Sequence, residues 1–110
     1  MAFGQTQTNS RLRQLTMASS SSVMHFVYIL RCADNSLYIG ETDNVDDRVS
    51  RHQEGRACSY TAKRLPVSLV YVEEVASHLE GRRREHQLKG WTRRKKEALV
   101  AGDLAALKRL

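Results

Sequence analysis

A β-hairpin over residues 25–41 is the feature that most limits how this chain can fold. His25 to Arg31 alternates and is rich in β-branched and aromatic residues, which is typical of a strand. Residues 33–36 are Ala-Asp-Asn-Ser, and Asp and Asn favour turns because their side chains bond the nearby backbone. Leu37-Tyr38-Ile39 predicts a second short strand, closed by Gly40. With 110 residues, a chain built on this hairpin has room for one modest core and a single domain.

A helix is predicted directly after the hairpin. Thr42 or Asp43 is a plausible N-cap, and acids in the following turn favour the positive end of the helix dipole. The helix should run to about Glu54 and stop at Gly55. Residues 56–66 are expected to be irregular.

Strand and capping signals continue through the second half of the chain. Val67 to Glu74 predicts a third strand, and Ser77 begins a capping box that opens a second helix to Lys89. A third helix is expected over residues 92–100, and Asp103 can open a short terminal helix. The order β-β-α-β-α-α predicts an α+β fold, in which a small antiparallel three-stranded sheet is flanked by helices.

The composition of residues 1–23 differs from that of the rest. This segment is rich in Ser, Thr and Gln and contains no acidic residue, so it cannot bury enough apolar surface to offset its ordering entropy. We expect residues 1–23 to be disordered and residues 24–110 to form the domain. A start at Met24 and a transit peptide are open alternatives. A secretion signal is not expected, because the apolar region of such signals is missing.

Composition also bears on the compartment of the chain. No stretch approaches the about 18 apolar residues that a membrane helix needs. Cys32 and Cys58 form no CxxC pair, and a secreted chain this small usually carries more cysteine. We expect two free thiols, a cytoplasmic location and no membrane association, with a disulfide between the two cysteines as the alternative.

Positive charge concentrates between Arg82 and Lys96. The net charge of the chain is +6, and this stretch holds eight basic residues against one acid, Glu85. A local basic patch predicts contact with a polyanion, although a solvated helix face has the same composition. Trp91, inside the patch, either stacks on a base or anchors a helix to the core. The expected nucleic-acid contacts are Arg82, Arg83, Lys89, Arg93, Arg94, Lys95 and Lys96.

Five polar residues form a candidate catalytic set. Tyr28 and Tyr38 lie on neighbouring strands of the hairpin, where their hydroxyls can converge on one face. Arg48 and His52 are four residues apart and share a helix face. Glu85 offers a carboxylate to a hard divalent cation. A tyrosine, an arginine, a carboxylate and a basic surface are the parts of a metal-assisted phosphodiesterase.

The ordered set resembles the GIY-YIG nuclease superfamily, and in particular its short single-domain bacterial members. Tyr38-Ile39-Gly40 matches the second family motif, and Phe26-Val27-Tyr28 matches the first except for its glycine. Arg48, His52 and Glu85 stand at the positions of the family's arginine, histidine and metal-binding glutamate. The resemblance covers roughly residues 25–100 and implies a GIY-YIG endonuclease-like fold.

The resemblance implies metal-dependent hydrolysis of DNA, selective for structure rather than sequence, with single-stranded or branched DNA as partner and a role in DNA repair or recombination. One Mg²⁺ or Mn²⁺ would be held by Glu85 and otherwise by water, with no small-molecule cofactor. Tyr38 or Tyr28 would act as general base, Arg48 would bind the phosphate, and His52 would support the tyrosine. We assume a monomer. The alternatives are a nucleic-acid-binding module with this fold and little turnover, and a protein-interaction adaptor.

The sequence departs from the family pattern at three places. Many family members carry an asparagine beyond the glutamate, and residues 90–100 contain none. Phe26 replaces the first glycine, and its ring either narrows the groove or fills the core. Glu41 and the acids Asp43, Asp46 and Asp47 follow the second motif. They would repel a phosphate chain unless they face away from it or help to hold the metal.

Overall fold

The predicted hairpin is present and forms part of a three-stranded sheet. The structure, a computed structural model, describes residues 24–110, so the predicted disordered segment 1–23 lies outside the described residues. Strands β1 (His25–Arg31), β2 (Leu37–Thr42) and β3 (Ser68–Val75) pair antiparallel in the order β2-β1-β3. Asn35 takes a φ of 72° in the hairpin turn, as its side-chain chemistry favours.

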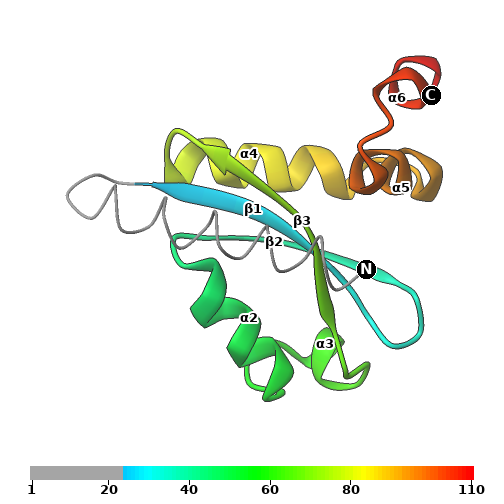
Figure 1. The fold of residues 1–110 in the computed structure, drawn as a ribbon. Helices are drawn as coiled ribbons and strands as arrows, with labels where there is room; N and C mark the ends of the chain where they lie inside the picture. Colours follow the sequence, from blue (N-terminus) through cyan, green and yellow to red (C-terminus); the bar gives the residue numbers. More distant parts are fainter. Residues whose placement is uncertain (1–23) are drawn as a thin grey trace.

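Helices lie on both sides of this sheet (Figure 1), which confirms the predicted α+β fold. The helices are α2 (Val45–Gln53), α3 (Ser59–Ala62), α4 (His78–Lys89), α5 (Arg93–Ala101) and α6 (Leu104–Arg109). Helix α3 was not predicted: it is a single turn whose N-cap residue, Cys58, makes no side-chain cap bond, so no capping signal marks it. None of the helices in residues 24–110 is long and apolar enough to cross a membrane.

Side-chain caps fix where the main helices begin. Ser77 accepts the amide of Glu80 at the start of α4, as the capping box predicts. At α2 the cap is Asn44, which accepts the amide of Asp47; the prediction of Thr42 or Asp43 was wrong. Thr42 is the last residue of β2, and its hydroxyl accepts the Asn44 amide instead.

The central strand β1 divides the core into two layers. Tyr28 and Leu30 face one side, where Cys32, Val67 and the half-buried Tyr38 pack against them. Residues 27 and 29 face the other side and pack with Leu88 of α4 and Leu99 of α5. In Figure 1, α2 and α4 accordingly lie on opposite sides of the sheet. Both faces of β1 are covered, which explains why its first six residues are all buried.

Gly81 lets α4 approach the sheet closely. A Cβ at this position would lie 2.9 Å from Cδ2 of His25 and 3.6 Å from Cβ of Glu41. A glycine near the helix start costs about 1 kcal/mol relative to alanine, but any side chain here would push the helix away from β1 and β2. The close approach places the next turn of α4, which carries Glu85, beside the β2 edge of the sheet.

Candidate active site

A buried hydrogen-bonded chain joins three elements on the α2 side of the sheet. The Tyr28 hydroxyl lies 2.9 Å from Nε2 of His52, and Nδ1 of His52 lies 2.7 Å from the Thr61 hydroxyl. Tyr28, His52 and Thr61 are 1%, 1% and 0% exposed. These side chains come from β1, α2 and α3, so this row of hydrogen bonds depends on the tertiary fold.

Burial and the charge of Arg48 determine the protonation states of His52 and Tyr28. Burial lowers the pKa of His52, and the charge of Arg48 lowers it further, so the imidazole is neutral at neutral pH. Burial raises the pKa of Tyr28 to about 12, against the charge and hydrogen bond of Arg48, so Tyr28 remains a phenol. A neutral histidine has one donor and one acceptor nitrogen. The phenol can therefore donate to Nε2 of His52 while Nδ1–H donates to Thr61.

Tyr38 lies on the same face as Tyr28 and is more accessible. The register pairs it with Leu30, two residues from Tyr28, and its ring centroid lies 5.0 Å from that of His52. Burial and a hydrogen bond with Cys58 raise the pKa of Tyr38, so it too is a phenol at neutral pH. Its ring stacks at 6.0 Å on Tyr60, which is exposed. Tyr38 thus connects the buried chain with the protein surface.

Gly40 stands opposite Tyr28 in the β1–β2 register, and its lack of a side chain makes room for the tyrosine. A Cβ at Gly40 would lie 2.6 Å from Cζ and 3.0 Å from Cε1 of Tyr28. Contacts between carbon atoms are most favourable near 3.5–4.0 Å. The glycine of the Tyr-Ile-Gly motif is therefore required by the position of the Tyr28 ring.

Two opposite charges act on the Tyr28 hydroxyl from different helices. Arg48 of α2 lowers the pKa of Tyr28, and Glu85 of α4 raises it. Glu85 also raises the pKa of Tyr38. The Glu85 carboxylate is 22% exposed and forms an ion pair of 2.8 Å with Nζ of Lys89. Hydrogen bonds, ring contacts and electrostatic interactions therefore link Tyr28, Tyr38, Arg48 and His52, whereas Glu85 acts on the two tyrosines through its charge, from α4.

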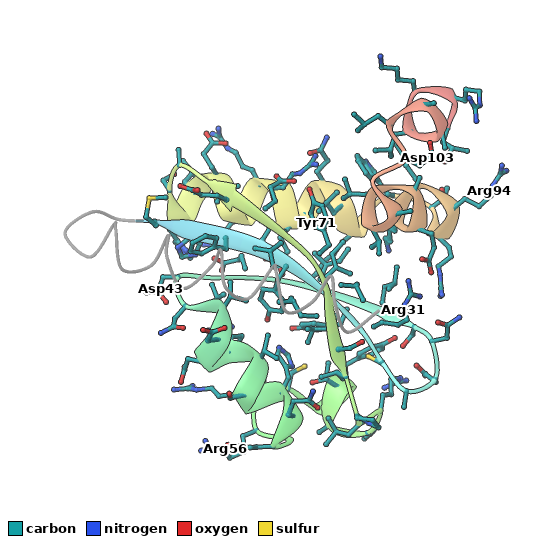
Figure 2. The ribbon with its side chains drawn as sticks, viewed as in Figure 1. Arg31, Asp43, Arg56, Tyr71, Arg94 and Asp103 are labelled. Carbon is teal, nitrogen blue, oxygen red and sulfur yellow. The ribbon has the colours of Figure 1, made fainter. Side chains whose placement is uncertain are left out.

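The predicted basic surface is distributed over two helices. The residues on α4 are Arg82, Arg83 and Lys89, and those on α5 are Arg93, Arg94, Lys95 and Lys96. Arg82 and Lys89 lie three residues before and four after Glu85, so they flank it on one face of α4. Arg94 projects outward from α5 (Figure 2). Of these seven residues, four make no side-chain ion pair or hydrogen bond within residues 24–110: Arg82, Arg94, Lys95 and Lys96.

Trp91 anchors α4 and α5 to the core, which is one of the two predicted alternatives. It is half-buried and packs against the cluster of Val27, Ile29 and Leu88. The guanidinium carbon of Arg84 lies 5.4 Å and Nζ of Lys95 4.4 Å from its ring centroid. Lys95 is therefore partly committed to a contact within the protein.

Two of the departures from the family pattern, Phe26 and Glu41, have structural explanations. Phe26 is 1% exposed and packs with Val45 of α2, so its ring fills the core. Glu41 pairs with Val27 in the register and therefore faces the α4 side, away from Tyr28. There it contacts His25 and His78. Its charge is thus turned away from the tyrosine pair.

Sequence reasoning missed three residues of this site: Cys58, Tyr60 and Thr61. All lie in or beside α3, inside the stretch predicted to be irregular. The Cys58 sulfur lies 3.5 Å from the Thr61 hydroxyl. The available signal was a run of hydroxyl and thiol side chains, Cys-Ser-Tyr-Thr, in a segment with no other pattern.

Comparison with known proteins identifies the family to which this protein belongs. The GIY-YIG catalytic domain matches residues 24–98, so the chain belongs to the GIY-YIG family, whose domain is that of a nuclease. Within it, the chain is 47% identical over 79 residues to a UPF0213 protein of Natronomonas pharaonis, covering 72% of this chain and 93% of that one. A UPF0213 protein of Staphylococcus haemolyticus is 45% identical over 76 residues, covering 69% and 93%. A solution NMR structure of a UPF0213 protein from Bacillus halodurans is 40% identical and covers 79% of this chain and 96% of that one, with a TM-score of 0.48.

Proposed function

We propose that this protein is an endonuclease that hydrolyses phosphodiester bonds of DNA with the help of one divalent cation. The observation that carries the proposal is the chain from Tyr28 to His52 to Thr61, with Arg48 and Glu85 both acting on the Tyr28 hydroxyl. A tyrosine that serves only packing does not need a buried histidine, an arginine and a carboxylate around its hydroxyl.

In the proposed reaction Tyr28 relays a proton to His52. A water attacks phosphorus as the P–O bond to the leaving oxygen breaks. The water gives a proton to the Tyr28 oxygen, while the Tyr28 proton passes to Nε2 of His52, 2.9 Å away, and solvent protonates the leaving oxygen. The relay avoids a free phenolate, which a pKa of about 12 disfavours at neutral pH. Thr61 keeps the ring oriented by its bond to Nδ1. Tyr28 is thus the general base and Tyr38 orients the water.

Arg48 and Glu85 would handle the charges of the phosphate. The guanidinium of Arg48 binds phosphate oxygens and stabilises the negative charge that develops on them. Glu85 fits a Mg²⁺ or Mn²⁺ site, because such ions are often bound by one carboxylate, substrate phosphate and water. The ion, when bound, supplies positive charge to the scissile phosphate and the leaving oxygen. Lys89, now paired with Glu85, would have to release the carboxylate.

The substrate proposed is single-stranded or branched DNA. Arg82, Lys89 and the basic residues of α5 contact the sugar-phosphate backbone, and such contacts carry no sequence information. Selection by shape follows, and it suits an enzyme of DNA repair or recombination acting as a monomer in the cytoplasm.

One observation favours the alternative of a binding module with little turnover. In this structure Tyr28 is 1% exposed, and Lys89 neutralises Glu85. A cleavage-competent state needs water at the tyrosine and a free carboxylate. If neither forms when DNA binds, the same residues support binding alone.

The test uses the full chain with labelled single-stranded, duplex, flap and branched DNA, in Mg²⁺, Mn²⁺ or EDTA. Glu85→Gln removes the charge and keeps the shape, and we expect it to abolish cleavage without changing the thermal midpoint. Glu80→Gln is the matched control, because Glu80 is an exposed acid on the same helix whose one ion pair within residues 24–110 is with Arg83.

Cleavage by the wild type and by Glu80→Gln, only with metal, supports the nuclease. Binding that weakens steeply with salt, but without cleavage on any substrate, selects the binding module. Cleavage that persists in Glu85→Gln or in EDTA contradicts the assigned role of the carboxylate.

A further inference from the structure

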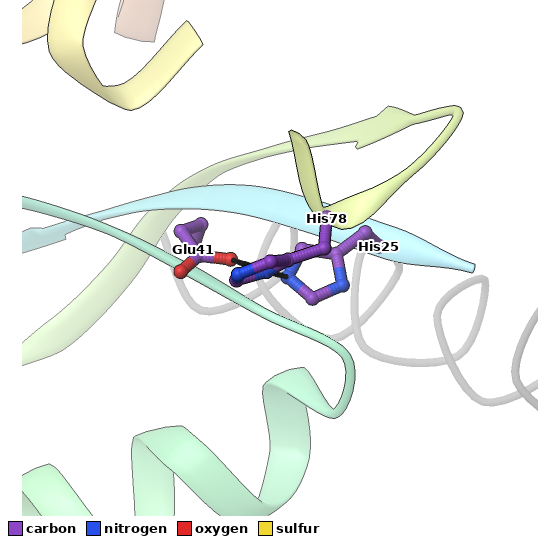
Figure 3. Close-up of side chains that lie close together, drawn as sticks. All are labelled: His25, Glu41 and His78. Carbon is purple, nitrogen blue, oxygen red and sulfur yellow. Dashed lines mark hydrogen bonds and ion pairs between the residues drawn. The ribbon is translucent and has the colours of Figure 1, made fainter. Parts of the chain in front are cut away.

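A second cluster of ligand-type side chains lies on the other side of the sheet. His25 is the first residue of β1, Glu41 is near the end of β2, and His78 is the first residue of α4. Figure 3 shows the two imidazole rings and the carboxylate directed at one point between these three elements. Their ligand atoms all lie within 4.8 Å of one another.

Two of the three distances in this cluster are compatible with a metal coordination face. Nδ1 of His78 lies 3.3 Å from Nε2 of His25 and 3.2 Å from Oε1 of Glu41. Nε2 of His25 also contacts Oε1 of Glu41. In a tetrahedral zinc site with bonds of about 2.0–2.1 Å, neighbouring ligand atoms are about 3.3 Å apart. Two of the three separations therefore match without rearrangement, and the third has to widen.

We propose that His25, Glu41 and His78 bind Zn²⁺ or a chemically similar transition-metal dication. Two imidazole nitrogens and one carboxylate oxygen suit zinc, whereas Mg²⁺ and Ca²⁺ prefer oxygen ligands throughout. The ligands bind through lone pairs when both rings are neutral, and the His78 side chain, 60% exposed, leaves the fourth position open to water.

The fold holds two of the three ligands in place. His25 is 8% exposed, and α4 packs on its ring where Gly81 has no Cβ. The Glu41 side chain is 19% exposed and is fixed by the pairing of β2 with β1. His78 is the more accessible ligand and needs only to keep its present rotamer. A site that is largely preformed loses little entropy when the ion binds.

This site is separate from Tyr28 and His52 of the proposed active site. His25 and Glu41 face the α4 side of the sheet, and Tyr28 faces the α2 side. Glu85 follows His78 by seven residues, two turns along α4. The zinc proposal does not rest on the nuclease function. Its consequence is structural: the ion ties together β1, β2 and the start of the helix that carries Glu85, and so stabilises the folded state.

The test measures zinc affinity and thermal midpoint on the full chain, whose residues 1–23 contain no His, Cys, Asp or Glu. The variants are His78→Ala and Glu41→Gln, with His86→Ala as control, because His86 is an exposed histidine on the same helix. Removing a group that hydrogen-bonds to a metal ligand costs about 10–100-fold in metal affinity, so we expect losses at least that large when a ligand itself is removed. Co²⁺ should report the same site by the visible absorption of a tetrahedral complex.

We expect the wild type to bind one Zn²⁺ per chain and its thermal midpoint to rise with zinc concentration. Both effects should be lost in His78→Ala and Glu41→Gln. Both should be kept in His86→Ala and Glu85→Gln. Excess Mg²⁺ should not displace the ion. The proposal is overturned if the wild type binds no zinc, or if His78→Ala binds it as tightly as the wild type. Because Glu85→Gln removes the proposed catalytic carboxylate and not this site, failure of one proposal is distinguishable from failure of the other.

Discussion

Replacing Gly40 with alanine tests the packing that supports the Tyr28 hydroxyl. Gly40 has no positive φ, so an alanine fits its backbone and the added Cβ is the whole perturbation. That Cβ would lie 2.6 Å from Cζ of Tyr28, about 1 Å inside an ordinary carbon contact. Tyr28 cannot move aside easily, because it is 1% exposed and packed with Leu30 and Val67.

Overpacking of this kind costs about 1–3 kcal/mol, and we expect Gly40→Ala to reduce the free energy of unfolding by about 2 kcal/mol. The measurement is urea denaturation followed by circular dichroism. Gly90→Ala is the matched control, since a Cβ there meets nothing closer than 3.5 Å and the φ of −84° suits alanine. We expect it to be neutral or slightly stabilising.

A double-mutant cycle tests whether the loss of stability in Gly40→Ala arises from contact with the Tyr28 ring. In a Tyr28→Leu background the ring atoms that the Cβ would meet are gone, so Gly40→Ala should then cost less than about 0.5 kcal/mol. The reasoning is refuted if Gly40→Ala is as stable as the wild type, or if it costs equally much with and without the Tyr28 ring.

Three further perturbations test other parts of the fold. Arg31 holds the pKa of Glu97 at about 2 by a two-point hydrogen bond. The Glu97 carboxylate therefore stabilises the fold fully above its ordinary pKa of 4.5, and this stabilisation is lost as the pH falls toward 2. Glu97→Gln should lower the free energy of unfolding at neutral pH by about 1–2 kcal/mol and remove this part of its pH dependence, as measured by urea titrations at several pH values. Thr61→Val should cost about 1–3 kcal/mol in unfolding free energy by leaving Nδ1 of His52 without a partner, and Thr61→Ser should restore most of it. Gly102→Ala should cost about 1 kcal/mol through its φ of 72° alone, since a Cβ there meets nothing within 4 Å; an unchanged urea midpoint would contradict this.

The sequence was sufficient to predict those elements of the fold whose signals lie within a few neighbouring residues. Alternation over residues 25–31, the turn residues after it and the cap at Ser77 each predict a structure within a few residues, and the structure has all three. The pairing of Tyr28 with Gly40 follows from the hairpin register. Their steric relation could be anticipated in outline, because a glycine opposite a tyrosine leaves room for its ring.

The remaining features depend on contacts between distant segments. Thr61 reaches His52 only because α3 folds back under α2, and one helical turn without a side-chain cap leaves no pattern. The cluster of His25, Glu41 and His78 joins residues up to 53 positions apart, and it depends on the close approach of α4 at Gly81. Gly81 carries no signal of this packing role in the sequence. Its function is visible once the sheet and helix are placed together.

The central claim is that the Tyr28 hydroxyl carries out proton transfer in DNA cleavage. The most direct measurement is the single-turnover cleavage rate of Tyr28→Phe, compared with Tyr38→Phe, on whichever labelled DNA the wild type cleaves in Mg²⁺. General acid–base catalysis contributes about 10²–10⁴-fold, so Tyr28→Phe should slow cleavage by at least about 10²-fold, and Tyr38→Phe should slow it less. Wild-type cleavage by Tyr28→Phe, with the loss confined to Tyr38→Phe, would contradict the relay through His52.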